Sequence, residues 1–212
     1  MSIIKITNLS KTIKGNTILN LVNLSIEKGQ TIGIIVRNGS GKSMLFKSIC
    51  GFVIPTSGSI QVFGKEVYKD ISFPEKTGFI IEHPGFIPQY SGFKNLKILA
   101  DIKNIISNDK ITESLKEVGL DPQDKKSVKK YSLGMKQRLG IAQAIMEDPE
   151  LLILDEPTNG LDKDGVIIIH SLLKKLKANG TTILMASHNP LDIENLCDHV
   201  YEMDKGDILL QR

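Results

Sequence analysis

The stretch Val36-Arg37-Asn38-Gly39-Ser40-Gly41-Lys42-Ser43 lies between an apolar run over residues 31–35 and an apolar helical pattern over residues 44–50. A glycine-rich turn between a strand and a helix is the context that a phosphate-binding loop needs. Backbone N–H groups in such a turn cradle phosphate oxygens, and the helix N-terminus adds a partial positive charge. The sequence therefore predicts a nucleoside-triphosphate site formed by Asn38, Gly39, Ser40, Gly41, Lys42, Ser43 and Met44.

Two side chains of this loop have expected chemical roles. Lys42 would reach the β- and γ-phosphates, and the Ser43 hydroxyl would bind Mg²⁺. The loop also departs from the usual pattern, because Val36 stands where a glycine normally begins it. A β-branched residue rarely adopts a positive φ. Either the loop keeps a conformation that valine tolerates, or phosphate binding is weakened, and the sequence leaves both open.

A second group of residues follows the apolar run 151–154, which ends at Asp155 and Glu156. An apolar run of this length is typical of a strand buried on both faces of a parallel sheet. Ligands bind beyond the carboxyl ends of such strands. We therefore expect Asp155 to hold Mg²⁺ and Glu156 to act as the general base for an attacking water. The alternative is a strand that merely ends in two exposed acids.

Three further motifs resemble those of a known family. Residues 131–138, Tyr-Ser-Leu-Gly-Met-Lys-Gln-Arg, are similar to the Leu-Ser-Gly-Gly-Gln signature of ABC-type ATPases and the Lys-Gln-Arg that usually follows it, with matches at Ser132 and Gly134. Residues 159–162 resemble the D-loop, which ends at Asp162, and the strand-like run 181–187 leads to His188, the family's switch-histidine position. Because these motifs occur in the expected order over nearly the whole chain, it is similar to the ATP-binding subunit of an ABC transporter.

The resemblance implies an α/β fold of the P-loop NTPase type, with a parallel core sheet, an antiparallel β-layer and an inserted helical subdomain. The chain would form a single domain over 1–212, with its core at 1–82 and 149–212 and the helical subdomain at about 83–148. Two ATP-binding subunits, identical or different, would face head to tail. Each ATP would lie between the phosphate loop of one subunit and Ser132 and Gly134 of the other.

The same resemblance assigns roles to single residues and names partners. Glu156, His188 and Lys42 would carry out ATP hydrolysis, and Asp162 would belong to the nucleotide site. Closure of the pair would be transmitted to a separately encoded membrane permease. The chain would therefore be cytoplasmic and peripheral on the inner face of the membrane.

Several positions depart from the family pattern. Ile13 stands at or near the position of an aromatic residue that stacks on adenine, and Met44 replaces a usual Thr or Ser. In the signature, Leu133 and Met135 also differ from the usual residues. These departures keep an alternative open, namely a nucleotide-binding regulatory module with little hydrolysis.

Another departure is Glu82, at the place of the family's Q-loop glutamine, where a carboxylate could serve as a further Mg²⁺ ligand. The surrounding stretch 81–86 is similar to a subgroup that contains bacitracin-resistance and lantibiotic-immunity exporters. The resemblance therefore suggests export of an antimicrobial peptide or a drug. The sequence does not identify the transported substrate, the direction of transport or the permease.

The composition limits the classes of function. The net charge of +3 is modest, and no stripe of basic and aromatic residues indicates nucleic-acid binding. DNA-repair ABC ATPases would need long heptad arms in place of 83–148, and translation-associated ones usually carry two such domains. No apolar run approaches the ~20 residues that a membrane span needs. We expect neither a signal peptide nor a C-terminal regulatory domain.

Other chemistry-bearing residues are interpreted as structural. Cys50 and Cys197 make no disulfide framework and are expected to be reduced, buried thiols. His83, His170 and His199 are expected to be solvated or satisfied by structural hydrogen bonds, because an isolated histidine is more often one of these than a catalytic group.

Hydrophobic periodicity predicts the remaining organisation. Strands are expected over 3–7, 17–26, 30–36, 59–63 and 78–81. Helices are expected over 42–50, within 91–119, and from Ser132 to residue 145. Three strand–helix units should follow, and the chain should close in a hairpin of strands at 200–203 and 208–210.

Overall fold

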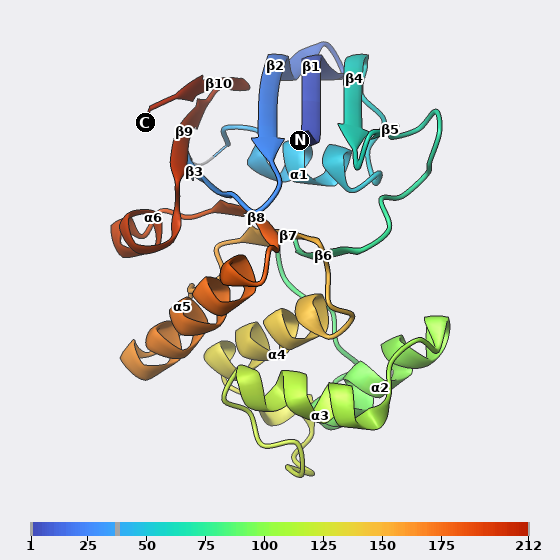
Figure 1. Ribbon diagram of the computed structural model, residues 1–212, viewed down its shortest axis with the longest axis vertical. Helices are drawn as coiled ribbons and strands as arrows, with labels where there is room; N and C mark the ends of the chain where they lie inside the picture. Colours follow the sequence, from blue (N-terminus) through green and yellow to red (C-terminus); the bar gives the residue numbers. More distant parts are fainter. Residues whose placement is uncertain (1, 37–38, 212) are drawn as a thin grey trace.

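The structure, a computed structural model, describes residues 2–36 and 39–211 (Figure 1). The strands are β1 Ser2–Ile13, β2 Asn16–Glu27, β3 Thr31–Val36, β4 Ser57–Val62, β5 Lys65–Glu66, β6 Thr77–Ile80, β7 Leu151–Asp155, β8 Thr182–Ala186, β9 His199–Asp204 and β10 Asp207–Leu210. The helices are α1 Lys42–Ile49, α2 Gly92–Lys103, α3 Asn108–Glu117, α4 Leu133–Ile145, α5 Lys163–Ala178 and α6 Pro190–Leu196, together with the short 3-10 helix η1 Val128–Lys130.

A mostly parallel sheet forms the centre of the molecule. Within the described residues its strand order is β10-β9-β3-β8-β7-β6, and only the β10–β9 pair is antiparallel. In β7, Leu151 and Ile153 enter one apolar cluster, whereas Leu152 and Leu154 enter another. All of β7 is buried. The apolar run is therefore a strand covered on both faces, as predicted.

One face of this sheet is covered by α1 and by an antiparallel sheet of order β2-β1-β4-β5. Phe46 and Ile49 of α1 are fully buried in the same cluster as Ile4 of β1, Ile60 of β4 and Ile153 of β7. Helix α1, which begins at the phosphate loop, is thus packed tightly within the fold. This confirms the antiparallel layer expected from the N-terminal strands.

The opposite face is covered by helices. Helices α2, α3 and α4 lie between β6 and β7 in the chain and occupy the end of the molecule opposite the antiparallel sheet (Figure 1). Leu96 of α2, Ile111 of α3 and Ile141 of α4 share one buried cluster with Leu152 of β7. The inserted helices therefore share a core with the sheet. Among the described residues, no helix has the length and apolar composition needed to cross a bilayer.

Besides the short strand β5, which was not predicted, the elements differ from the predicted ones in three main places. Strand β1 pairs with β4 as far as Ser10 and continues to Ile13 because it pairs with β2, with register shifts along its polar stretch. The helical region at 91–119 is divided, because Asn104 ends α2 in a left-handed conformation and Ser107 caps α3. After the inserted helices the chain forms two strand–helix units, β7–α5 and β8–α6, rather than three.

The two cysteines have different environments. Cys50 follows α1 and is fully buried, and this burial raises the pKa of its thiol to about 12. Cys197 is only partly buried. The expectation of a buried thiol is therefore right for Cys50 and wrong for Cys197.

The contact between β6 and α4 gives a stability prediction. A Cβ at Gly78 would lie 1.9 Å from the Ala144 carbonyl oxygen, which is backbone and cannot swing away. We expect Gly78→Ala to lower the free energy of unfolding by about 3 kcal/mol, and the melting temperature by about 6–12 °C. Calorimetry and urea unfolding would measure both.

Gly85→Ala is the matched control, because a Cβ at Gly85 would meet no atom within 4 Å. Its effect should stay within about 0.5 kcal/mol. Equal stabilities of the two variants would contradict the close packing of α4 on β6.

Candidate functional site

The phosphate loop turns between β3 and α1. Val36 is the last residue of β3 and pairs with β9, so its backbone is extended, which suits a β-branched residue. Arg37 and Asn38 lie outside the described residues, and the role of Asn38 stays a prediction. Gly41 begins α1 with a φ of 101°, and a Cβ there would lie 2.5 Å from the Ile18 carbonyl oxygen. Glycine is required at Gly41 on both grounds.

The other described residues of the loop continue this turn. Gly39 is exposed, whereas Ser40 is buried and its carbonyl accepts a hydrogen bond from the Gly206 N–H at 2.9 Å. Ser43 and Met44 are partly buried in the first turn of α1. The first N–H groups of a helix have no acceptor within the helix. The loop therefore presents donors where phosphate oxygens are predicted to bind.

Lys42 joins the loop to the two acids at the end of β7. Its Nζ lies 2.5 Å from Asp155 Oδ1 and 3.6 Å from Glu156 Oε1. Strands β3, β8 and β7 are neighbours and parallel, so their carboxyl ends meet at one edge of the sheet. The structure thus brings the predicted lysine together with both predicted acids. The Asp155 side chain is only 6% exposed, so it is not an exposed acid at a strand end.

His188 lies on the other side of Glu156. Its Nδ1 is 2.7 Å from Glu156 Oε2, and its backbone N–H donates to the same oxygen at 3.3 Å. Glu156 therefore contacts Lys42 through one carboxylate oxygen and His188 through the other. The His188 side chain is 68% exposed and open to a ligand, whereas Glu156 is 19% exposed.

The backbone of Glu156 is held in an unusual conformation. Its φ of 51° lies in the left-handed region, which costs a residue other than glycine about 1–3 kcal/mol. Its N–H donates to the Ala186 carbonyl at 2.9 Å, and its carbonyl accepts a hydrogen bond from Gln137 Nε2 at 3.0 Å. Gln137 is buried on α4 and was not predicted as part of the site, although it belongs to the Lys-Gln-Arg run after the signature.

Glu82 approaches the acids through its backbone and not through its carboxylate. Its N–H donates to Asp155 Oδ2 at 3.4 Å, and its φ is 61°. Its carboxylate instead contacts Lys47 Nζ of α1 at 2.7 Å and is 56% exposed. The side chain would have to leave Lys47 to reach a metal ion beside Asp155.

The signature residues lie at the start of α4. Ser132 caps this helix, as predicted, because its Oγ accepts a hydrogen bond from the Met135 N–H at 3.1 Å. A Cβ at Gly134 would lie 2.8 Å from the Gly160 carbonyl oxygen, so the signature packs against the D-loop. Helix α4 contacts α3, α5 and β6, whereas α1 contacts β2 and β4. The signature and the phosphate loop therefore belong to different parts of one chain.

Asp162 has a structural partner within the chain. Its Oδ1 accepts a hydrogen bond from the Gly165 N–H at 2.9 Å and caps α5. A contact between Asp162 and nucleotide stays a prediction.

The donors near Lys42 fit a magnesium ion. Mg²⁺ prefers hard oxygen ligands and is usually bound by one or two protein oxygens together with substrate phosphates. Asp155 supplies a nearly buried carboxylate, and the Ser43 hydroxyl lies in the first turn of the helix whose Lys42 touches that carboxylate. Asp155 and Ser43 would hold the ion. Glu82 is a further ligand only if it leaves Lys47.

A buried polar cluster adjoins His188 and was not predicted as part of the site. It consists of Asp192, whose carboxylate is fully buried, and of the four side chains that contact it: Thr158, His170, Ser187 and Asn189. His170 is thus a histidine satisfied by a structural contact, as expected. The only sequence signal for Asp192 is its position four residues after His188.

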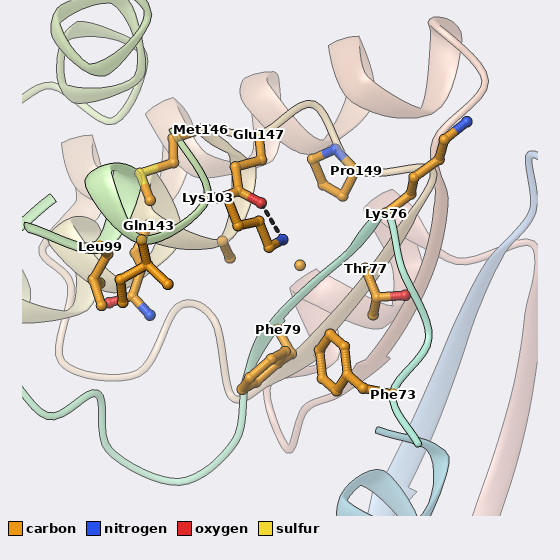
Figure 2. Close-up of a pocket in the computed structure, with 13 residues that line it drawn as sticks. Phe73, Lys76, Thr77, Phe79, Leu99, Lys103, Gln143, Met146, Glu147 and Pro149 are labelled. Atoms are coloured by element: carbon orange, nitrogen blue, oxygen red, sulfur yellow. Dashed lines mark hydrogen bonds and ion pairs between the residues drawn. The ribbon is translucent and has the colours of Figure 1, made fainter. Parts of the chain in front are cut away.

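A separate hollow of about 230 Å³ lies where the inserted helices meet the edge strand β6 (Figure 2). Phe73 and Phe79 line it from the sheet side, and Leu99 and Lys103 line it from α2. Lys103 Nζ contacts Glu147 Oε2 at 2.6 Å across its wall. The rings of Phe73 and Phe79 also pack with Phe52, which is 53% exposed.

Comparison with known proteins agrees with the fold and the motifs. The profile of the ABC transporter family matches residues 19–159. An uncharacterised ABC transporter ATP-binding protein of Bacillus subtilis, YybJ, is 48% identical, and the match covers 96% of this chain and 93% of that protein. The bacitracin transport ATP-binding protein BcrA of Enterococcus faecalis is 43% identical, over 98% and 68% of the two chains.

Two further similarities extend this result. The lantibiotic transport ATP-binding protein SrtF of Streptococcus pyogenes is 41% identical, over 99% of this chain and 90% of that protein. The bacterial ABC transporter cassette MJ0796, solved as a dimer, superposes with a TM-score of 0.88 at 25% identity, over 99% and 97% of the two chains. The chain therefore belongs to the ABC transporter family, as one of its ATP-binding ATPase cassettes.

The position of Glu82 gives a prediction about the metal. If its carboxylate leaves Lys47 and joins the ion when nucleotide binds, Glu82→Gln removes one negatively charged ligand. We expect the Mg²⁺ concentration for half-maximal ATP binding to rise about tenfold. A Mg²⁺ titration at fixed ATP concentration, with a fluorescent nucleotide, would measure it.

Glu117→Gln is the control, because Glu117 also contacts a lysine, Lys175 at 2.7 Å, but lies on α3. An unchanged Mg²⁺ requirement in Glu82→Gln would remove Glu82 from the metal site.

Proposed function

We propose that this chain hydrolyses ATP to drive a separate membrane permease, with Glu156 as the general base. The observation that supports this most directly is the position of Glu156 between Lys42 and His188, with one carboxylate oxygen close to each. A carboxylate held between a phosphate-binding lysine and an exposed histidine can accept a proton from a water placed at the γ-phosphate.

The roles of the residues follow from their positions. The ATP phosphates would bind along residues 39–44. Lys42 would then leave Asp155 and contact the negatively charged phosphates. Glu156 would orient and deprotonate the water, and His188, which is mostly exposed, would contact the γ-phosphate. When bound, Mg²⁺ supplies further neutralisation of phosphate charge. Catalysis would rest on positioning and electrostatics rather than on a covalent intermediate.

A second subunit would complete each site. Ser132 and Leu133 are exposed at the N-terminus of α4. Helix α4 packs on α3, α5 and β6, whereas α1, which follows the phosphate loop, packs on β2 and β4. The exposed N-terminus of a helix offers N–H groups and a partial positive charge to an anion. The similar cassette MJ0796 was solved as a dimer, which supports a paired arrangement of two such subunits. The pair would consist of two copies of this chain or of this chain and a related subunit.

The transported substrate is proposed from the relatives alone. BcrA and SrtF are named for bacitracin and lantibiotic transport, and both are more than 40% identical to this chain. We therefore propose the export of a peptide antibiotic or a similar amphipathic compound.

The permease would dock beside the hollow at β6. Phe52, Ile54 and Ile102 are 53%, 65% and 76% exposed. Ile102 lines the hollow, and Phe52 packs on the rings of Phe73 and Phe79, which also line it, while Ile54 follows Phe52 by two residues. Exposed apolar patches of this kind mark interaction sites. The patch lies where the inserted helices meet the sheet, so a partner there would sense movement between them. The chain would thus be held at the inner face of the membrane.

The ATPase proposal predicts a dependence on protein concentration. The turnover rate per subunit should rise with protein concentration, because two chains are needed for each site. Glu156→Gln should lower turnover by about 100-fold or more and leave ATP affinity within about threefold of the wild type. Phosphate release and nucleotide binding measure the two quantities.

Turnover of Glu156→Gln at the wild-type rate would overturn the assignment of the general base. ATP binding without turnover by the wild-type chain, even with its permease, would favour the nucleotide-binding regulatory module.

The docking proposal predicts that a substitution on this surface weakens binding of the permease without changing ATP hydrolysis. Phe52→Lys should weaken association with the co-expressed permease by about tenfold or more, because it places a charge in an apolar contact. ATP hydrolysis by the isolated chain should stay unchanged. Leu209→Lys is the control, since Leu209 is 68% exposed on β10, at the sheet edge opposite β6. Equal association of both variants with permease-containing membranes would exclude this surface.

A further inference from the structure

Asp192 of α6 is a buried carboxylate that the proposed chemistry does not use directly. Its Oδ2 accepts hydrogen bonds from Thr158 Oγ1 at 2.6 Å and Ser187 Oγ at 2.7 Å. Its Oδ1 lies 2.7 Å from His170 Nε2 and accepts a hydrogen bond from Asn189 Nδ2 at 3.3 Å. A buried carboxylate is costly unless it is hydrogen-bonded, and here both oxygens have partners.

The donors to Oδ2 lie on the two segments that carry the catalytic pair. Thr158 follows Glu156 by two residues, and Ser187 immediately precedes His188. Glu156 and His188 contact each other at 2.7 Å through their side chains. One buried oxygen of Asp192 therefore ties together both backbone segments on which this contact depends.

We infer that Asp192 is a positioning residue that holds His188 against Glu156, with His170 and Asn189 fixing the other carboxylate oxygen. This inference rests on the proposed role of Glu156 and His188 in hydrolysis. Asp192 touches neither side chain, so it acts on the reaction only through the relative placement of the two segments. Small displacements of reacting groups are enough to lower a rate strongly.

Thr158→Val is the sharpest test, because it keeps the shape of the side chain and removes only the bond from the Glu156 segment to Asp192. Ser187, Asn189 and His170 still satisfy the carboxylate in this variant. We expect kcat for Mg-ATP hydrolysis to fall about tenfold, with KM within about threefold. Asp192→Asn should likewise lower kcat and leave KM nearly unchanged.

Thr181→Val is the matched control. Thr181 is 8% exposed and Thr158 is 7% exposed. Within the described residues the Thr181 hydroxyl likewise makes one hydrogen bond, which it donates to the Pro149 carbonyl at 3.4 Å. It lies before β8, at the end of that strand away from Ser187. An equal loss of kcat in Thr158→Val and Thr181→Val would overturn the inference, because it would show a general effect of a lost buried hydroxyl.

A double-mutant comparison tests whether the effect passes through the histidine. If Asp192 acts by placing His188, Thr158→Val should lower kcat by less than about twofold when His188 is already replaced by Ala. The same tenfold loss in both backgrounds would overturn the inference.

A second readout does not depend on turnover. The ring ¹⁵N resonance of His188 Nδ1 reports its contact with Glu156, and NMR of the full chain with ¹⁵N-labelled histidine would follow it. We expect the resonance to move in Thr158→Val and Asp192→Asn, toward its position in Glu156→Gln, and to stay in place in Thr181→Val. An unmoved resonance in both cluster variants would overturn the inference. Failure of the proposed function would instead show as equal turnover of wild type and Glu156→Gln.

Discussion

The burial of the parallel sheet on both faces is the constraint on which the site depends. Every residue of β7 and β8 is buried, so these strands can present polar groups to a ligand only where they end. The carboxyl ends of β3, β7 and β8 lie side by side, so the phosphate loop, the two acids and His188 all emerge at one edge. The contacts of Lys42 with Asp155 and Glu156 are a direct consequence of this parallel order.

The position of Glu156 depends on more than the strand that carries it. Its left-handed backbone conformation is unfavourable, and two hydrogen bonds from neighbouring elements hold it. One involves β8 and the other the side chain of Gln137 on the signature helix. A movement of α4 would therefore act directly on the backbone of Glu156. This provides a physical connection between the signature region and the carboxylate of the same subunit.

Much of the site could be predicted from residues close together in the chain. The phosphate loop, the apolar strand with its two acids, and the Ser132 cap each need only local spacing, because their chemistry is contained in a few consecutive residues. Glu82 shows the limit of that reasoning. Its position in the chain is that of a metal ligand, but its carboxylate contacts Lys47, because α1 passes within reach of the loop after β6.

From its sequence alone, this chain is recognisable as an α/β nucleotide-binding protein, since hydrophobic periodicity and glycine spacing are properties of consecutive residues. The length of β1, the division of the inserted helices and the Asp192 cluster could not be obtained in this way. Ser187 and Asn189 lie within five residues of Asp192, but Thr158 and His170 come from the segment after β7 and from α5, and the packing of α5 and α6 on the sheet brings these two to the carboxylate. A buried carboxylate needs several partners at once, and tertiary packing supplies them from distant parts of the chain.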